Sequence, residues 1–294
     1  MRKILFIIII LVSICVFPGA VFGEDDSNSA LYFWRFINEA RANPMETIHK
    51  LGIDESAARE ALGENAWVLE SGLPPLAWNT ILAHAASGHN NDMITNLYYS
   101  STGLDGSTVS DRIGEAGYTA LSSGEVFGAL AFLNFIGPLE AARIIFDNWV
   151  RYELDPSRNV KKTIFNTDLT EIGISFMGAV LDLGEDIPYN VYVAVADLAR
   201  PAEHRAYILG NVYRDINGNR RFDPGEGVPG MRMIIKGYLS GRDSELASHF
   251  WGAYQLEIPQ SFFTVKVLDD SGTVIVRRAW FGDDVNHIMD FRIQ

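Results

Sequence analysis

The chain has 294 residues, which is enough for one large domain or for two domains of ordinary size. Its composition, with 48% hydrophobic and 21% charged residues, is that of a globular protein and excludes wholesale disorder and collagen-like repeats. Asp and Glu outnumber Lys and Arg by 37 to 24, so the formal net charge is -13 and the protein would repel the phosphates of a nucleic acid. We therefore expect no nucleic-acid partner.

The first 23 residues have the layout of a secretory signal peptide. Arg2 and Lys3 precede the apolar run Ile4–Val16, and small residues around Gly23 provide a cleavage site before an acidic segment. An uncleaved membrane anchor is the alternative, because the apolar stretch is just long enough to span a bilayer. We expect cleavage after Gly23 and no stable membrane insertion of the mature protein.

The only cysteine is Cys15, so the mature protein would contain none. Export without disulfides is more typical of a bacterial protein than of a eukaryotic secreted one. Ile14, which precedes Cys15, is too large for the small-residue site at which bacterial lipoproteins are usually cleaved. The sequence therefore predicts a bacterial protein that is secreted to the extracellular space or the cell envelope.

The hydrophobic pattern is mostly helical from residue 29 to about residue 166. A first helix, with its apolar face at Leu31, Trp34 and Ile37, stops at Asn43-Pro44. Asn43 is then in position to cap the next helix. Later helices are predicted to run to Gly52, from Asp54 to Gly63, from Asn79 to Leu97, and from Pro138 to Glu153.

The pattern then changes to the short apolar runs of β-strands. Glu171–Met177 and Tyr189–Ala196 are predicted strands, with a turn at residues 184–186 between them. The polar stretch Leu198–Tyr207 is the predicted domain boundary. Beyond it, short strands alternate with Gly-, Pro- and Asp-rich turns, which predicts a small all-β sandwich. Its predicted strands are Ile208–Tyr213, Met231–Ile235, Tyr254–Ile258, Phe262–Val267, Val274–Arg278 and Ile288–Ile293.

Several short motifs follow one another in the first part of the chain. They are Ile37–Pro44, Leu73–Asn79, Ala86–Met93, Asp111–Ile113, Gly117-Tyr118, Gly124-Glu125 and Thr170–Ile174. In this order and spacing they resemble the CAP superfamily, which includes cysteine-rich secretory proteins, antigen 5 and pathogenesis-related plant proteins. The resemblance covers residues 29–199 and implies an α-β-α sandwich around a central groove, secretion, and no universal activity. Together with the predicted β-sandwich it makes the expected fold class α+β.

Many members of this superfamily carry two histidines and two glutamates in the groove, where they can bind zinc or another divalent ion. The histidine pair is missing here. Ser101 stands where the first histidine would fall, and the stretch Ser157–Lys162, where the second would fall, has none. No histidine occurs between His89 and His204. The resemblance therefore implies a CAP-type domain without the metal-binding histidine pair.

Two glutamates are the candidate catalytic residues. Glu125 matches the glutamate of the superfamily's Gly-Glu-Asn motif, although Val126 replaces the asparagine. Glu153, four residues after Trp149, is a looser match for the second. Such a pair could perform acid–base chemistry if burial or mutual repulsion raised one pKa. The alternative is that Glu125 is a structural residue in a polar groove floor and Glu153 an exposed carboxylate at a helix end.

Two further features of this region have structural interpretations. His89 shares a helix face with Ala85 and Met93, which predicts a hydrogen-bonded core histidine, matching one that many superfamily members keep outside the metal set. The apolar stretch Phe127–Phe135 is expected in the core, with an apolar groove for a lipid as the alternative. The sequence has no His-Glu-x-x-His, Gly-x-Ser-x-Gly or phosphate-loop signature.

Residues 215–226 form a run of oxygen donors. With Asp215 as position 1, side-chain oxygens fall at positions 1, 3, 5, 9 and 12 and a free carbonyl at 7, which is the ligand order of an EF-hand loop and suits calcium. An acidic hairpin loop without an ion is the alternative. The candidate ligands are Asp215, Asn217, Asn219, the Arg221 carbonyl, Asp223 and Glu226.

This loop departs from an EF-hand because its glycine is at position 4 and strands are predicted on both sides. Gly210–Asn219, Gly225–Gly230, Trp251–Leu256 and Asp290-Phe291 instead resemble the Sdr/Cna-type B domains of bacterial surface proteins. The resemblance covers residues 205–294. It implies a structural calcium and a role as a stalk or spacer.

We therefore expect a secreted bacterial protein that acts as an extracellular binding or scaffolding module. A CAP-type domain without the histidine pair would bind a carbohydrate, a peptide or a lipid, and a calcium-braced β-domain would hold it. The alternatives are a secreted hydrolase of peptide or envelope polymer that uses Glu125 and Glu153, and a lipid-binding protein.

Overall fold

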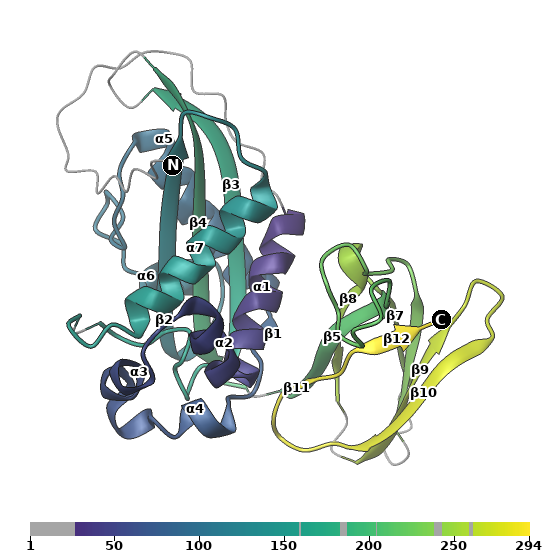
Figure 1. The fold of residues 1–294 in the computed structure, drawn as a ribbon. Helices are drawn as coiled ribbons and strands as arrows, with labels where there is room; N and C mark the ends of the chain where they lie inside the picture. Colours follow the sequence, from purple (N-terminus) through teal and green to yellow (C-terminus); the bar gives the residue numbers. More distant parts are fainter. Residues whose placement is uncertain (1–26, 159, 183–186, 204, 238–242, 259–260) are drawn as a thin grey trace. The chain divides into compact units, whose positions relative to one another are not determined.

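The structure is a computed structural model that describes residues 27–158, 160–182, 187–203, 205–237, 243–258 and 261–294 (Figure 1). The proposed signal segment, the turn at residues 184–186 and His204 lie outside the described residues. The chain divides into two compact units, one made of residues 1–71 and 79–201 and the other of residues 72–78 and 202–294. Among the described residues, no helix has the length and apolar character needed to cross a membrane.

The helices of the first unit begin and end largely where the sequence predicts. Asp54 and Asn79 cap α3 and α5 with their side-chain oxygens. Asn43 occupies the N-cap position of α2 before Pro44, as predicted, but its side chain makes no capping hydrogen bond. The helices are α1 (Ser27–Ala42), α2 (Pro44–Leu51), α3 (Glu55–Leu62), the 3-10 turn η1 (Gly63–Asn65), α4 (Val68–Ser71), α5 (Thr80–Asn96), α6 (Val109–Glu115) and α7 (Pro138–Glu153).

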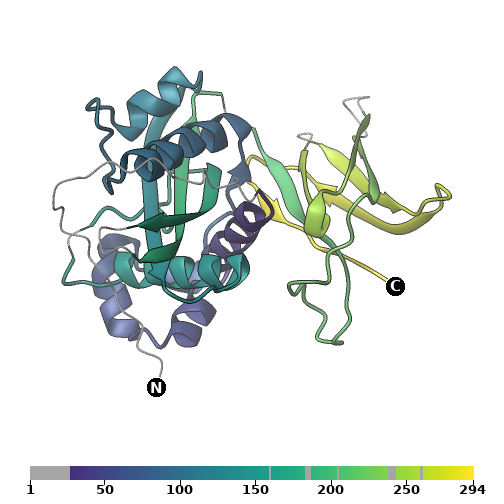
Figure 2. The same ribbon diagram turned by 90° about the horizontal axis from the view of Figure 1, so that it is seen from above.

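Three long antiparallel strands form the middle layer of this unit: β2 (Ala120–Phe132), β3 (Glu171–Asp182) and β4 (Pro188–Pro201). β4 is central and pairs with β3 on one side and β2 on the other. Helices α5 and α6 lie on one face of this sheet and α1 and α7 on the other (Figure 2). The predicted α-β-α sandwich is therefore confirmed.

Two glycines show how closely the helices approach the sheet. A Cβ added to Gly173 on β3 would lie 1.9 Å from the backbone nitrogen of Ala83 in α5. A Cβ added to Gly128 on β2 would lie 2.6 Å from Nε1 of Trp149 in α7. The two glycines mark opposite faces of the sheet, and at Gly173 the neighbour is backbone that no side-chain rotation can move.

The strand β2 is absent from the sequence predictions, which expected Phe127–Phe135 to be core. Its run of Ser, Gly and Ala residues has low strand propensity. In the structure Phe127 is only half-buried, and Leu133 and Phe135, beyond the strand end, are 60% and 73% exposed. The predicted connector at Leu198–Tyr207 also begins too early, because β4 continues to Pro201 as a buried central strand.

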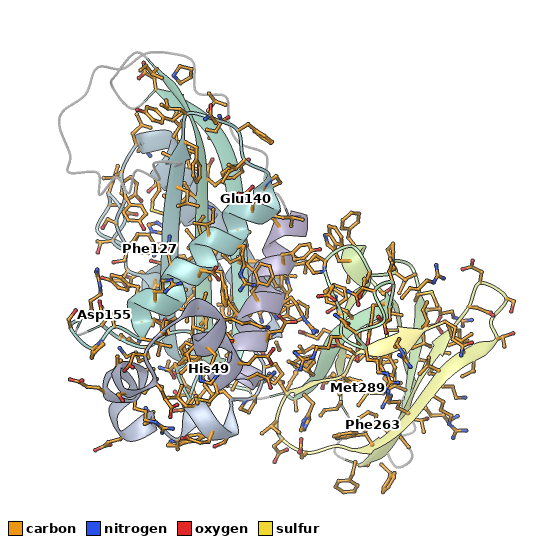
Figure 3. All side chains as sticks on the ribbon, in the orientation of Figure 1. His49, Phe127, Glu140, Asp155, Phe263 and Met289 are labelled. Carbon is orange, nitrogen blue, oxygen red and sulfur yellow. The ribbon has the colours of Figure 1, made fainter. Side chains whose placement is uncertain are left out.

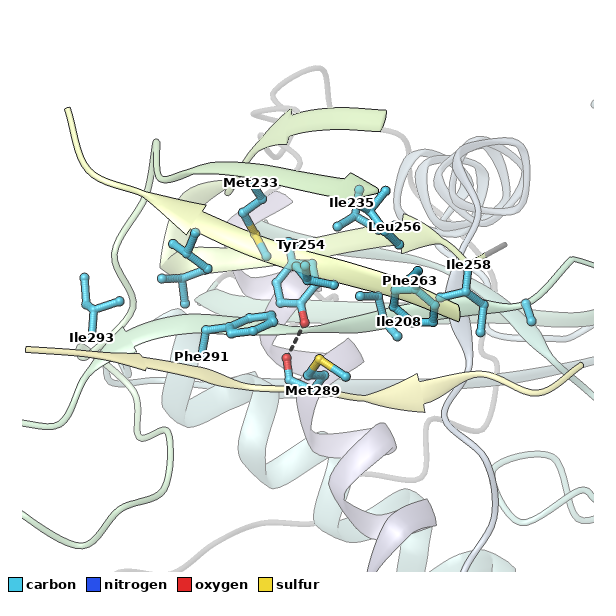
Figure 4. Packing of buried hydrophobic residues seen from close by; sticks show 14 residues of the cluster. Ile208, Met233, Ile235, Tyr254, Leu256, Ile258, Phe263, Met289, Phe291 and Ile293 are labelled. Carbon is cyan, nitrogen blue, oxygen red and sulfur yellow. Dashed lines mark hydrogen bonds between the residues drawn. The ribbon is translucent and has the colours of Figure 1, made fainter. Parts of the chain in front are cut away.

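The second unit consists of strands in two sheets, as predicted for a β-sandwich. One sheet has the order β10-β9-β6-β7, and in the other β5 pairs with β8, β11 and β12. Residues of both sheets form one core, in which the Tyr254 hydroxyl donates a hydrogen bond to the Met289 carbonyl (Figure 4). The elements are β5 (Tyr207–Arg214), β6 (Arg232–Gly237), β7 (Asp243–Ala247), η2 (Phe250–Gly252), β8 (Ala253–Glu257), β9 (Phe262–Leu268), β10 (Val274–Phe281), β11 (His287–Ile288) and β12 (Phe291–Ile293). The short strand β1 (Ala77–Trp78) precedes α5 and is part of neither of these two sheets.

The segment Gly72–Trp78 belongs to this second unit, although it precedes α5 in sequence. The side-chain amide of Gln255 bonds both backbone groups of Trp78, accepting from its nitrogen at 2.6 Å and donating to its oxygen at 3.0 Å. The Asn286 amide donates to the Pro75 carbonyl at 2.9 Å in a buried position. Side-chain amides thus bind this segment much as a neighbouring strand would.

Candidate functional site

Glu125, the first candidate catalytic residue, lies on the sheet-edge strand β2 and its side chain is only 3% exposed. Its Oε2 accepts a hydrogen bond from Nη2 of Arg112 at 2.5 Å. Its Oε1 lies 3.9 Å from Nε2 of His89. The carboxylate is therefore paired with a guanidinium in a nearly closed position, with a histidine beside it.

Arg112 also binds the segment that precedes α6. Its guanidinium donates to the carbonyl of Ser107 at 3.0 Å and to that of Ser101 at 3.1 Å. Ser101, which the sequence analysis places where the superfamily's first histidine would fall, contacts the cluster through its backbone oxygen. One side chain thus connects Glu125 to two points of the 98–107 segment.

His89 is a core histidine, as predicted. It is 1% exposed on the face of α5 that also buries Ala85 and Met93. Its Nε2 lies 2.9 Å from the Ser100 carbonyl, which can only accept, so this nitrogen carries the proton. Burial lowers the pKa of His89, and the opposing effect of Glu125 is smaller, so the ring is neutral at pH 7.

Asp197 completes this cluster and is the residue that the sequence analysis missed. It lies on β4 directly opposite Glu125 and is fully buried. Burial raises the pKa of Asp197 well above its usual value, and the charge of Glu125 raises it further. The sequence did contain a signal for Asp197, because it is the one acid inside the apolar run Ala194–Ala199. An acid is rarely buried without a partner, so such a position indicates a special environment.

Glu153, the second candidate, is buried at the end of α7, so the expectation of an exposed carboxylate is wrong. Its two oxygens accept hydrogen bonds from the backbone nitrogens of Thr163 (2.9 Å), Ile164 (2.8 Å) and Phe165 (3.3 Å). Burial raises the pKa of Glu153 to about 7, although these amide donors act in the opposite direction. Its bonds are those of a structural residue that fixes a loop.

The two glutamates are not brought together. Glu125 meets Arg112, His89 and Asp197, whereas Glu153 meets the backbone of residues 163–165. Among the described contacts these two sets have no residue in common. The acid that lies beside Glu125 is Asp197.

Three half-exposed aromatic side chains, Tyr99, Phe127 and Tyr152, form what we call the aromatic surface. The rings of Tyr99 and Phe127 have centroids 4.7 Å apart, and the guanidinium carbon of Arg158 lies 4.6 Å from the centroid of Tyr152. Burial of its hydroxyl end, and then the charge of Tyr152, raise the pKa of Tyr99 to about 12. Figure 3 labels Phe127 on β2 and Asp155 just after α7, the helix that carries Tyr152. Tyr99 and Tyr152 are 50% and 49% exposed.

The candidate calcium ligands lie in the loop between β5 and β6. The side-chain amides of Asn217 and Asn219 both donate to Oδ2 of Asp223, so three of the six candidates converge. The oxygens of Asp215 accept from the backbone nitrogens of Gly218 and Arg220 at 2.8 and 3.0 Å.

Glu226 closes the same loop from a buried position. Its Oε1 accepts from the nitrogen of Ile216 at 2.9 Å and its Oε2 from that of Asp223 at 3.0 Å. Arg292 lies 3.3 Å from Asp215 and supplies a positive charge there. In the part of the chain that the structure describes, no three His, Cys, Asp or Glu side chains are grouped so that they could hold a metal ion.

Comparison with known structures finds extracellular and surface proteins of bacteria. An extracellular protein with an SCP domain from Bacillus anthracis is 18% identical, with a TM-score of 0.36, over 59% of this chain and 41% of that one. An outer surface protein from Borrelia burgdorferi is 18% identical, with a TM-score of 0.35, over 60% of this chain and 98% of that one. The Bacillus anthracis TIE protein is 11% identical, with a TM-score of 0.24, over 42% and 24%.

This chain therefore spans about two fifths of the first of these proteins. No curated protein matches it. The family model described as CAP, the cysteine-rich secretory protein family, matches residues 34–180, which is half of the chain. The match contains the helices α2 to α7, the strand β2 and the cluster residues His89, Arg112 and Glu125. The chain belongs to the CAP family.

Proposed function

We propose that this protein is a secreted bacterial binding protein whose CAP domain recognises an extracellular ligand without catalysis. The observation that supports this most directly is the state of the two glutamates. Glu125 is paired with Arg112 and nearly closed off, and Glu153 is occupied by backbone amides. A general acid or base must lie within hydrogen-bond reach of its substrate, and neither carboxylate is exposed for that purpose.

The aromatic surface is the proposed ligand site. Tyrosine side chains offer large rigid contact area together with a polar end, which suits recognition of a carbohydrate or a peptide. About half of the surface of Tyr99 and of Tyr152 is open to solvent. Leu133 and Phe135, more exposed still, are the residues that would favour a lipid instead.

The test is a binding assay of the secreted chain with three probes: insoluble peptidoglycan, a mixture of unstructured peptides, and phosphatidylcholine vesicles. We expect binding to one probe, weakened about tenfold or more in Tyr99→Ala/Tyr152→Ala. Trp67→Ala is the matched control, because Trp67 is a similarly exposed aromatic residue, at 49%, outside the aromatic surface. Binding to no probe, or equal losses in both variants, would contradict the proposal.

The same assay addresses the hydrolase alternative. Release of soluble fragments from the bound polymer, abolished by Glu125→Gln, would favour an enzyme over a binding protein. That alternative requires Glu125 and Glu153 to face each other across the groove, whereas Glu125 contacts Arg112 and His89 and Glu153 accepts from the backbone of residues 163–165. We therefore expect no release.

We further propose that calcium braces the 215–226 loop. The donors are carboxylate, amide and carbonyl oxygens, which are the ligands that calcium prefers. Asn217 and Asn219 already point at Asp223, and rotation of an amide by half a turn exchanges its nitrogen for its oxygen. The ligands would be Asp215, Asn217, Asn219, Asp223, Glu226 and the Arg221 carbonyl. Bound calcium would neutralise the acids and stiffen the loop.

A further inference from the structure

Two acids lie side by side inside the first unit. Glu125 on β2 and Asp197 on β4 are directly opposite in the antiparallel register. Opposite residues in such a pair have Cβ atoms about 5 Å apart on the same face of the sheet. Neither oxygen of Asp197, nor Oε1 of Glu125, accepts a hydrogen bond from an N–H or O–H donor among the described residues. We call these two residues the carboxyl pair.

The groups that face the carboxyl pair supply one positive charge. From α6 comes Arg112, which binds Oε2 of Glu125. From α5 comes His89, which is neutral because burial lowers its pKa. On β3 the residue opposite Asp197 is Gly173, which has no side chain.

The other acids of this region have their own donors or lie at the surface. Asp92 on α5 accepts from the Tyr98 hydroxyl. Glu171 on β3 accepts from the Asn79 amide at 2.7 Å and from the Tyr118 hydroxyl at 2.8 Å. Asp105, in the 98–107 segment, is exposed and accepts from the Ser107 nitrogen. Among the side chains that the structure describes, Arg112 is thus the single cation that contacts these two buried carboxyl groups.

We infer that Glu125 and Asp197 share one proton at neutral pH, and that this proton keeps Arg112 on Glu125 and thereby keeps the 98–107 segment bound to the cluster. Two buried carboxylates in contact cannot both be ionised without a large cost, because their repulsion adds to the loss of hydration. A shared proton also supplies the donor that the unpartnered oxygens otherwise lack.

The consequence is that the attachment of the 98–107 segment to the cluster depends on pH. Loss of the proton leaves two negative charges beside one guanidinium. The second negative charge is stabilised only if water reaches Asp197 and hydrates it. Arg112 donates to Ser101 and Ser107, and His89 to Ser100, so admitting water through this cluster loosens the 98–107 segment. This inference concerns the protein without a ligand and does not depend on the proposed binding function.

The raised pKa of Asp197 agrees with this account. A carboxyl group with a raised pKa in the folded state contributes stability that is full below its unfolded pKa and is lost as the pH rises through the folded value. The 98–107 segment is therefore closed, that is, hydrogen-bonded to Arg112 and His89, at acidic and neutral pH. It opens, that is, loses these hydrogen bonds, toward alkaline pH. Asp197→Asn imitates the protonated acid at every pH and should keep the segment closed.

The first measurement is infrared spectroscopy of the whole secreted chain in D2O at pH 7. Because Glu153 itself titrates near pH 7, the spectrum is recorded in Glu153→Gln. We expect a carbonyl band of one protonated carboxyl group that is absent when Asp197→Asn is added to this variant and present when Glu171→Gln, a matched buried acid of the same sheet, is added instead. A Glu153→Gln spectrum without a protonated carboxyl group at pH 7 would overturn the inference.

The second measurement is amide hydrogen exchange of residues 98–107 between pH 5 and pH 10, corrected for the intrinsic rates. Wild type and Glu171→Gln should lose protection by about tenfold or more toward the alkaline end, and Asp197→Asn should not. Glu125→Gln, which removes the partner of Arg112, should be poorly protected throughout. Equal pH profiles for wild type and Asp197→Asn would show that the carboxyl pair does not control the segment.

Discussion

Arg41 on α1 and Glu153 on α7 bind complementary polar groups of one loop. The Arg41 guanidinium donates to the carbonyls of Ile164 at 2.7 Å and Asn166 at 2.9 Å, while the Glu153 carboxylate accepts from the amides of residues 163–165. Both side chains are buried. Burial lowers the pKa of Arg41 to about 9, and the charge of Glu153 partly restores it. Two opposite charges are thus buried together with the loop that they fix.

Removal of the Glu153 carboxylate should therefore destabilise the first unit. Glu153→Ala leaves three buried amides without an acceptor and Arg41 without its opposite charge, and we expect a loss of about 3–5 kcal/mol. Glu140→Ala, at the exposed start of the same helix, should change stability by less than about 1 kcal/mol. Urea unfolding of both variants measures the difference. A loss in Glu153→Ala no larger than in Glu140→Ala would contradict the structural role.

The raised pKa of Glu153 makes this contribution depend on pH. The folded pKa of about 7 exceeds the ordinary value of 4.5, so the stability due to protonated Glu153 is full below about pH 4.5 and is lost as the pH rises through 7. A shift of this size corresponds to about 3 kcal/mol. Glu153→Gln cannot ionise, so the difference in unfolding free energy between wild type and this variant should change between pH 4.5 and 8. A constant difference would show that Glu153 titrates normally.

The calcium proposal predicts a change in thermal stability. Addition of millimolar calcium should raise the melting temperature of the second unit, because an ion that binds only the folded state stabilises it by mass action. Asp215→Ala should remove the response, and so should Glu226→Gln in part. Asp270→Ala is the control, since Asp270 is an exposed acid of the same unit in another loop. If calcium does not change the melting temperature of the wild type, the proposal that this loop binds calcium is wrong.

The close packing of α5 on β3 predicts opposite effects for two glycine substitutions. Gly173→Ala would place a methyl group 1.9 Å from the backbone of Ala83, so helix and sheet must separate, and we expect a loss of about 3 kcal/mol or more. Gly88→Ala, on the exposed face of α5 with nothing within 4 Å, should stabilise the protein by about 1 kcal/mol. Chemical unfolding of both variants compares them directly. A tolerated Gly173→Ala would refute the close approach.

Local sequence signals predicted the parts of this fold that depend on local chemistry. Asp54 and Asn79 cap helices because their side chains can reach the first free amides, and this requires no knowledge of the rest of the chain. Most strands of the β-sandwich were likewise visible as short apolar runs between turns, although β7 was not predicted and the predicted strand Ile288–Ile293 is divided into β11 and β12. The strand β2 was not, because its Ser, Gly and Ala residues acquire their conformation from pairing with β4.

The site was less predictable because its properties come from distant partners. Glu153 stands at a helix end, where most acids are exposed, and only the loop at residues 163–165 makes it a buried acceptor. Glu125 was identified from a motif, but its relation to Asp197 depends on the register of β2 against β4. No spacing along the chain encodes a contact between residues 72 positions apart. The carboxyl pair therefore becomes visible only in three dimensions.

The hydrogen bonds of Gln255 and Asn286 to Trp78 and Pro75 bear on how this protein can be divided. A recombinant fragment that starts at residue 202 would lack the segment Gly72–Trp78. The side-chain amides of Gln255 and Asn286 would then lose their backbone partners. Such a fragment is incomplete even though it contains every strand from β5 to β12. Transfer of the second unit into another protein would therefore require both of its parts, residues 72–78 and residues 202–294.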